Sequence, residues 1–201
     1  MLDRGEFARA HAYCQQGQEL AKLIKHRALL SILLETQGEC FLAQHEYSQG
    51  RQVLQEAVAI ARQIKHAEFL SLALCNLGKA IGYVEAYDRA RGYFQESLAL
   101  VQQLSAPVLL IILLTTWGGT ELFHGQFATA RQHFLEVLVL EAEEQRYPEM
   151  LARAHYGLAH IALQEKNIGK AREHAAESMR LFKQIGHYKA QEVQAWIEAL
   201  P

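Results

Sequence analysis

The feature that most constrains this chain is an internal repeat with a period of about 40 residues. One series of small residues keeps this spacing: Gly38, Gly78, Gly118 and Ala159. A second series is aromatic or aliphatic, and each member has a small residue three positions after it: Phe7, Tyr47, Tyr87, Phe127 and Ile168. Independent positions that share one period are typical of a protein built from stacked copies of one supersecondary unit.

Each repeat is predicted to be a pair of helices. In one repeat, apolar residues recur three or four positions apart, as on one face of an amphipathic helix: Leu70, Leu74, Leu77 and Ile81. Pro107 and Pro148 come where the first helix of a pair begins, a position at which a missing backbone N–H costs nothing. A glycine inside a helix costs about 1 kcal/mol relative to alanine, so Gly38 and its equivalents predict a close approach of the second helix.

The pattern predicts an all-α protein, an α-solenoid of about ten helices in one domain without an internal linker. The chain opens with a second helix and closes with an unpaired first helix. This indicates a piece of a longer protein, or a repeat that is completed in another way. The expected boundaries within the single domain 1–201 are a half-repeat 1–27, repeats 28–67, 68–106, 107–147 and 148–187, and a C-terminal helix 188–201.

Composition and charge exclude several classes of protein. Hydrophobic residues make up 50% and charged residues 21% of the chain, which rules out a disordered segment. The formal net charge is −2 and there is no basic block, so no nucleic-acid contact is expected. The aliphatic run 108–114 is too short to span a membrane, and the charged N-terminus does not fit a signal peptide. The three cysteines form no C-x-x-C pair, which favours a cytoplasmic location.

Two cysteines have repeat equivalents that allow a prediction. Cys14 takes the place of Leu54 and Phe94, so we expect it in the core. Cys75 takes the place of residues that differ in the other repeats, which are Glu35, Thr115 and Tyr156. That variation predicts a solvent-facing position and leaves two alternatives, an inert surface thiol and a reactive one.

The residues give no support for catalytic or metal chemistry. No nucleophile elbow, phosphate-binding loop or dinucleotide motif occurs, and no glutamates are paired by spacing for acid–base work. The histidines lack the spacings of zinc sites. His26, His66 and His187 share one repeat position near the end of a second helix, where a cationic side chain suits the helix dipole. We therefore expect no catalytic residue, no metal site, no cofactor and no enzymatic activity.

At the level of the motif, the chain resembles the tetratricopeptide repeat. Two units carry the pattern most fully, with Leu77, Gly78, Ile81, Ala90 and Phe94 in one and Trp117, Gly118, Ala130 and Phe134 in the next. The proline that normally closes the unit is missing, and the period is longer than the usual value of about 34 residues. Such lengthened repeats resemble those in the sensor arms of bacterial signal-responsive transcription regulators and in cytosolic peptide-pheromone receptors.

The resemblance implies a right-handed solenoid whose first helices line a concave groove. It also implies a non-catalytic protein–protein interaction scaffold that binds a peptide or helical segment of a partner in that groove. The expected contacts are polar or aromatic residues at inward positions: Asn76, Lys79, Tyr83, Phe123, Tyr156 and His160. The alternative function is a peptide- or small-ligand-sensing regulatory domain of a bacterial transcription regulator. The structural alternative is that these side chains only cover the concave face.

One second helix differs from the others on its outer side. Leu135, Val139 and Ala142 form an apolar stripe there, whereas the equivalent positions of the other repeats include polar residues. A contiguous apolar stripe on one helix usually marks a contact surface. We expect a homodimer or a partner protein to bind at this stripe, and the alternative is that the solenoid itself covers it.

Overall fold

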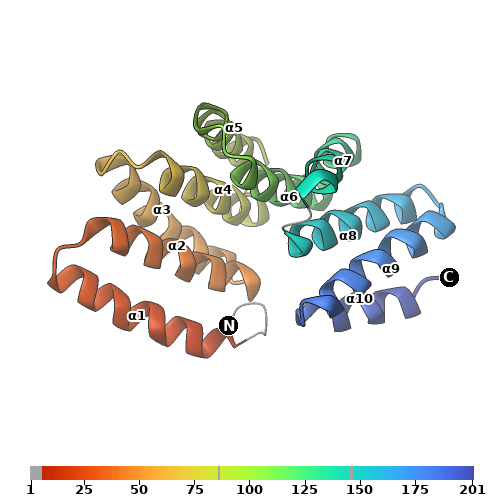
Figure 1. Ribbon diagram of the computed structural model, residues 1–201, viewed down its shortest axis with the longest axis horizontal. Coiled ribbons are helices and arrows are strands. Elements are labelled where there is room, and N and C mark those ends of the chain that lie inside the picture. The colour runs from red at the N-terminus through yellow and green to blue at the C-terminus, as the bar shows by residue number, and fades with distance from the viewer. Residues whose placement is uncertain (1–5, 86, 145–146) are drawn as a thin grey trace. The chain divides into compact units, whose positions relative to one another are not determined.

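The computed structural model describes residues 6–85, 87–144 and 147–201, and within these ranges the protein is all-α, as predicted. The described residues form ten helices and no strand (Figure 1). The helices are α1 (Phe7–Leu23), α2 (Arg27–Ala43), α3 (Tyr47–Gln63), α4 (Ala67–Val84), α5 (Tyr87–Leu104), α6 (Pro107–Phe123), α7 (Phe127–Glu144), α8 (Pro148–Gln164), α9 (Ile168–Gln184) and α10 (Lys189–Glu198).

The helix boundaries confirm the repeat that the sequence indicated. Every residue of the aromatic or aliphatic series is the first residue of a second helix, from Phe7 in α1 to Ile168 in α9. The two internal prolines begin α6 and α8, both of which are first helices. The even-numbered helices are therefore the first helices of the hairpins, and the odd-numbered helices are the second helices.

The chain divides into two compact units, Met1–Thr116 and Trp117–Pro201. In the first unit, α1 to α4 each pack against the next helix, and the first helices α2 and α4 also contact each other. In the second unit, α7, α8 and α9 each pack against the next helix. The repeat boundaries and the single domain expected from the sequence stay predictions.

The glycines of the repeat lie where two helices approach closely, as predicted. A Cβ atom on Gly78 would lie 3.0 Å from the ring of Phe94, and one on Gly118 would lie 3.0 Å from the ring of Phe134. On Gly38 it would lie 2.5 Å from Leu54. The large residue that packs against each glycine is fully or almost fully buried. The absence of a side chain at the glycine therefore allows the two helices of each hairpin to pack closely.

The turns between hairpins correct the role that we expected for three histidines. Lys25 and Lys65 adopt positive φ values of 56° and 54° after the second helices, and His26 and His66 follow them. Nδ1 of His26 accepts a hydrogen bond from Leu29 N–H at 3.1 Å, and His66 caps α4 in the same way. His187 accepts from the N–H of Lys189 at 3.1 Å. The histidines therefore act as acceptors that begin the next helix, because an N-terminal turn leaves backbone donors unsatisfied.

The cysteine and membrane predictions have clear outcomes in the described ranges. Cys14 is buried, which confirms its assignment to the core. Among the described residues, no helix combines the length and the apolar character that a membrane crossing requires.

Candidate functional site

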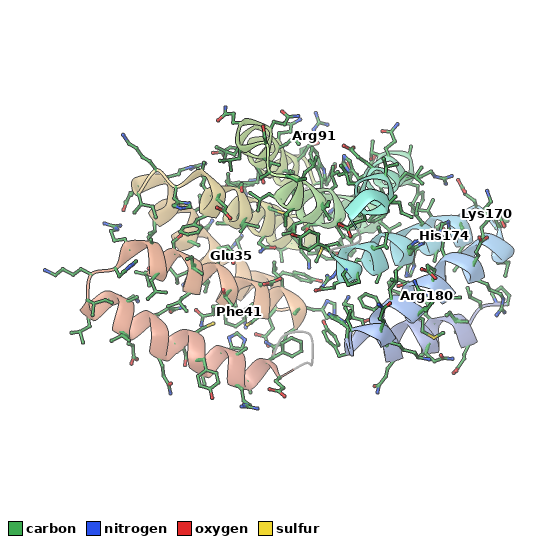
Figure 2. All side chains as sticks on the ribbon, viewed as in Figure 1. Glu35, Phe41, Arg91, Lys170, His174 and Arg180 are labelled. Atoms are coloured by element: carbon green, nitrogen blue, oxygen red, sulfur yellow. The ribbon has the colours of Figure 1, made fainter. Side chains whose placement is uncertain are left out.

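In the first unit, polar side chains from two neighbouring first helices form a cluster. Glu35 and Glu39 come from α2, and Cys75, Asn76 and Lys79 come from α4; Figure 2 labels Glu35 on α2. We call these five residues the inner polar cluster. The amide Nδ2 of Asn76 donates a hydrogen bond to Oε1 of Glu35 at 2.6 Å, so the cluster links two successive hairpins.

Glu35 is the residue of this cluster with the most altered acidity. Burial raises the pKa of its carboxyl group to about 8, and the neighbouring charge of Glu39 adds to this effect. The hydrogen bond from Asn76 opposes the rise and does not cancel it. At neutral pH most Glu35 side chains are therefore protonated and carry an O–H donor beside the Asn76 amide. Strongly shifted pKa values are typical of functional sites.

Cys75 contradicts the sequence prediction of a solvent-facing position. Its side chain is 2% exposed, and burial raises the pKa of the thiol to about 12, although a hydrogen bond with Thr116 and the charge of Lys79 act in the opposite direction. The position varies in sequence because neighbouring first helices meet there, and the equivalent Thr115 is also buried. A thiol with this pKa is almost entirely protonated at neutral pH, so the reactive alternative is contradicted too.

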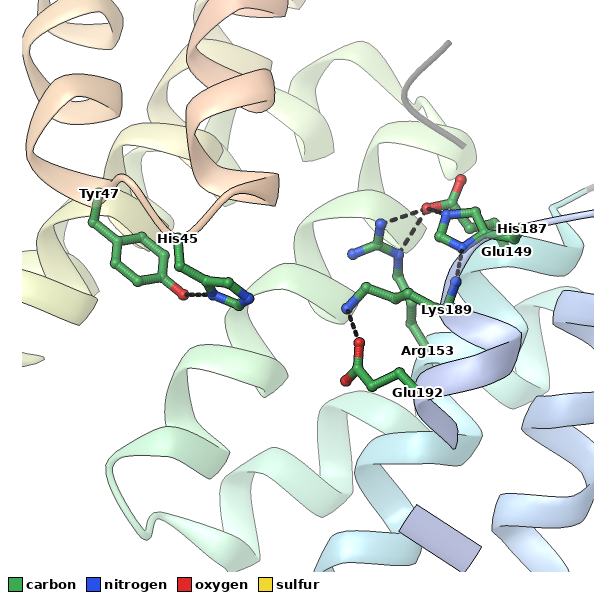
Figure 3. Close-up of polar contacts among 7 residues, drawn as sticks. All are labelled: His45, Tyr47, Glu149, Arg153, His187, Lys189 and Glu192. Atoms are coloured by element: carbon green, nitrogen blue, oxygen red, sulfur yellow. Dashed lines mark hydrogen bonds and ion pairs between the residues drawn. The ribbon is translucent and has the colours of Figure 1, made fainter. Parts of the chain in front are cut away.

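Tyr83 lies at the end of α4 against an aromatic side chain of its own unit. Its ring stacks on that of Tyr47, with the centroids 4.4 Å apart and the planes at 11°. The Tyr47 hydroxyl lies 2.8 Å from Nδ1 of His45 (Figure 3). Burial raises the pKa of Tyr83, and burial followed by the proximity of Tyr83 raises that of Tyr47 to about 12. Tyr83 is therefore held in place before any partner binds.

In the second unit, Tyr156 and His160 of α8 pack around Trp196 of α10. The ring of Trp196 lies 5.6 Å from that of Tyr156 and 4.7 Å from that of His160, centroid to centroid. Burial lowers the pKa of His160, and burial followed by the charge of Glu192 raises that of Tyr156 to about 12. The sequence analysis did not single out Trp196. Extending the repeat series would have found it, because Trp196 comes 40 residues after Tyr156.

Phe123, the remaining predicted contact, is the last residue of α6 and belongs to the second unit. Its side chain is exposed, and its ring stands perpendicular to that of His124 at 5.1 Å. The structure thus places Asn76 and Lys79 in one cluster and Tyr156 with His160 in another.

A charged network fixes the start of α10 to α8 in the second unit (Figure 3). Nε of Arg153 donates to Oε1 of Glu149 at 2.7 Å, and Nε2 of the buried His187 lies 3.6 Å from the same oxygen. Burial alone would raise the pKa of Glu149, but the nearby His187 side chain and the charge of Arg153 outweigh it and lower the pKa to about 2. We interpret this network as structural, because its charges face one another.

The apolar stripe on α7 is exposed in the structure. Leu135 is 48% and Val139 is 67% exposed, and Ala142 is exposed as well. The role of the whole stripe as an interface stays a prediction. Within the described residues, no group of three or more histidine, cysteine, aspartate or glutamate side chains is arranged to hold a metal ion.

The comparisons with known proteins identify the fold alone. No protein-family model and no curated protein sequence matches the chain. BtubC from P. vanneervenii has a similar structure, with a TM-score of 0.67 and 16% sequence identity over 92% of this chain and 76% of that one. A Rap protein, solved in complex with the competence and sporulation factor, gives a TM-score of 0.68 and 13% identity. That match covers 99% of this chain and only 60% of the Rap chain. These similarities show a helical-repeat fold.

Proposed function

We propose that this protein is a non-catalytic interaction scaffold of the tetratricopeptide type that binds a peptide or helical segment of a partner on the inner side of its first helices. The observation that carries the proposal is the inner polar cluster. Asn76 offers an amide donor and acceptor, and a protonated Glu35 adds a neutral donor. Such a set suits the N–H and C=O groups of a peptide backbone better than it suits a charged ligand.

In the proposal, aromatic residues add contacts within each of the two units. Tyr83 contributes a ring that is already braced by Tyr47, so little side-chain freedom is lost when a partner packs against it. Tyr156 and His160 are braced in the same sense by Trp196. Phe123 is the exposed aromatic side chain among the predicted contacts. Pre-organised aromatic side chains are typical of residues that contribute most to binding energy.

The sensing domain stays the second candidate, since one observation favours it. The Rap protein of similar fold was solved with the competence and sporulation factor bound, so a chain of this fold can hold a signalling factor. A DNA-binding or nucleotide-switch domain in the same polypeptide would favour this candidate over a plain scaffold. For both candidates we propose a cytoplasmic location, which three free thiols suit.

The test begins with peptides selected from a random displayed library against the immobilised protein. Fluorescence anisotropy then gives the Kd of one selected peptide for the wild type and for Asn76→Ala and Lys79→Ala. We expect each variant to weaken binding by at least about tenfold, in the range of an interface residue that dominates binding. Gln95→Ala, at an exposed position of α5, is the matched control and should leave Kd unchanged.

Two results would overturn the proposal. One is a library that yields no peptide binding to the folded protein. The other is a selected peptide whose Kd is the same for Asn76→Ala, Lys79→Ala and the wild type, because binding would then occur on another surface.

A further inference from the structure

In the first unit, three short turns that lead from a second helix to a first helix lie at the same end of the hairpins. They comprise residues 24–26, 64–66 and 105–106. The hydroxyl of Ser31 in α2 donates to the carbonyl of Ala57 in α3 at 3.3 Å. The hydroxyl of Ser97 in α5 donates to the carbonyl of Ser71 in α4 at 2.8 Å. Each bond joins the first half of a first helix to the second half of a second helix. We call the three turns and the helix ends beside them the turn edge.

The turn edge carries an excess of positive charge, although the formal net charge of the whole chain is −2. Its five cationic side chains are all exposed: Lys22, Lys25, Arg27, Arg62 and Lys65. Three glutamates lie near them in the sequence or in space: Glu19, Glu68 and Glu96. Glu96 accepts two hydrogen bonds from Arg62 at 2.7 Å, and Arg27 donates to Gln63. Among the described residues, Lys22, Lys25 and Lys65 form no ion pair, so their charges face solvent.

Aliphatic side chains project from the turn edge between these cations. One repeat position at the end of the second helices holds Ile24, Ile64 and Leu104. Ile24 is 55% and Leu104 is 41% exposed, and Ile64 is half-buried. Ile185, the equivalent residue after α9 in the second unit, is 36% exposed. The exposure therefore recurs along the chain and does not depend on where the repeat array begins. Repeats stack through the sides of their helices, so the turns stay accessible.

We propose that the turn edge binds the surface of an anionic lipid bilayer. The lysines contact the phosphate and carboxylate groups of the lipid head groups, which supply the negative charge that these side chains lack within the protein. Ile24 and Leu104 enter the boundary between the head groups and the acyl chains, where their side chains leave water. A protein bound in this way lies on the membrane and does not span it. The turn edge is distinct from the inner polar cluster, so this proposal does not rest on the proposed function.

The build of the turn edge favours a bilayer over other anionic partners. A nucleic acid would pair with the cations through its phosphates, but it would offer no apolar phase to the aliphatic side chains between them. An acidic protein segment gains most from a groove that encloses its apolar side chains. Ile24 and Leu104 instead project from separate turns. A fluid bilayer adapts to separate projecting side chains and takes up each of them independently.

The expected strength of binding follows from the same side chains. Each lysine or arginine near an anionic membrane surface strengthens binding by about fivefold. Lys22, Lys25 and Lys65 together therefore contribute roughly a hundredfold, and this part weakens as salt screens the charges. The entry of Ile24 and Leu104 adds a contribution that salt does not screen. The proposal therefore predicts reversible binding that needs both kinds of side chain.

The test measures how the full 201-residue chain binds to large unilamellar vesicles in a sedimentation assay. One set of vesicles is pure phosphatidylcholine, and the other contains about 30 mol% phosphatidylserine, which supplies the negative surface potential. We expect the protein to sediment with the anionic vesicles and to stay in the supernatant with the neutral ones. Raising the NaCl concentration from about 0.1 M to about 0.5 M should release most of the bound protein.

Two double variants test the two kinds of side chain. Lys25→Gln combined with Lys65→Gln should weaken binding to the anionic vesicles by at least about tenfold. Ile24→Ser combined with Leu104→Ser leaves the charge unchanged and should weaken binding by at least about fivefold.

A third double variant, Lys166→Gln combined with Lys170→Gln, is the matched control. It removes the same charge from exposed positions, and Lys166 has a positive φ of 60°, close to the 56° of Lys25. These two lysines lie where a first helix ends and a second helix begins, so they are outside the turn edge. The control should bind the vesicles as the wild type does.

The outcomes separate the alternatives. The substituted side chains are exposed, so every variant should keep the wild-type circular dichroism spectrum and Tm, and a loss of binding then reports the surface. Wild-type protein that does not sediment with the anionic vesicles would overturn the proposal, as would unchanged binding by either the lysine or the serine variant. Binding to labelled polyglutamate in place of the vesicles would also overturn it, because the turn edge would then belong to an acidic protein segment.

Discussion

Asn76 and Glu35 lie 41 residues apart in sequence, and the amide of one donates a 2.6 Å hydrogen bond to the carboxyl group of the other. The two side chains come from α4 and α2, the first helices of successive hairpins. The contact therefore does two things. It joins neighbouring repeats, and it places polar groups on the side of the first helices that the proposed function assigns to the partner.

The first prediction concerns the pH dependence that Glu35 gives to the stability. Its pKa of about 8 in the folded protein is above the ordinary value of 4.5, so the folded state holds this proton more tightly than the unfolded state. The folded state therefore loses stability as the pH rises from about 4.5 through 8.

Glu35→Gln removes this loss. Its Tm should match the wild type near pH 4.5 and exceed it by at least about 3–6 °C at pH 9, since a rise in pKa of one unit alone corresponds to about 1.4 kcal/mol, and 1 kcal/mol to about 2–4 °C in a protein of this size. Thermal melts at both pH values give the measurement, with Glu56→Gln, at an exposed position of α3, as the control. A Tm difference that does not change with pH would contradict the assignment.

The second prediction compares two glycines of the second unit. A Cβ atom at Gly157 would lie 2.2 Å from the buried ring of Phe134, whereas at Gly119 it would meet nothing within 4 Å. Gly157→Ala should therefore lower the free energy of unfolding by about 1–3 kcal/mol through overpacking. Gly119→Ala should raise it by about 0.5–1 kcal/mol, because alanine is the better helix former. Thermal melts of both variants measure the effect. Equal changes in Tm for Gly157→Ala and Gly119→Ala would show that the contact with Phe134 does not limit the packing.

The third prediction concerns acid stability and the pair of histidines between α8 and α9. Burial lowers the pKa of His155 and of His174, and the proximity of His174 lowers that of His155 further, while Glu177 opposes this. The unfolded state therefore binds more protons than the folded state once the pH falls below about 6.5, and stability decreases there.

The variant that carries His155→Gln and His174→Gln should lose less Tm than the wild type between pH 7.5 and pH 5. The fall in Tm of each protein is measured from its own Tm at pH 7.5. This reference is needed because the variant also loses the contact between the two rings, which lowers its stability at every pH. Parallel Tm curves for the two proteins over this range would show that the pair does not cause the acid sensitivity.

Much of the fold could be predicted from the sequence because the repeat encodes each hairpin locally. Gly78 and Phe94 lie 16 residues apart, and their pairing follows from one glycine and one large residue in the same unit. The comparison of repeat units also predicted that Cys14 lies in the core, and the structure confirms it. Such contacts recur in each unit, so a comparison of the units finds them.

The candidate site was less predictable because it depends on contacts between neighbouring hairpins. Cys75 varies among the repeats and yet is buried, because the first helices pack side by side at this position. The stacking of Tyr83 on Tyr47 and the packing of Trp196 on Tyr156 also join different hairpins. The residue type alone does not show which neighbour a side chain meets. The role of His26 was missed for a different reason, since capping depends on the turn that precedes the helix.

The fourth prediction concerns the apolar stripe on α7. If Leu135, Val139 and Ala142 form a contact between two copies, the wild-type protein should be a dimer in light scattering. Leu135→Glu combined with Val139→Lys should convert it to a folded monomer, because both side chains are exposed in the single chain. A wild-type protein that is already monomeric at high concentration would contradict self-association through this stripe and leave a foreign partner as its ligand.

Photo-crosslinking of a library-selected peptide tests the central claim most directly. A photoreactive benzoylphenylalanine is placed at position 39, the exposed member of the inner polar cluster on α2, or at position 95, an exposed position of α5. If the partner binds along the first helices, irradiation of the complex should link the peptide to the protein from position 39 and not from position 95. A crosslink from position 95 alone, in a complex that still forms, would contradict the account.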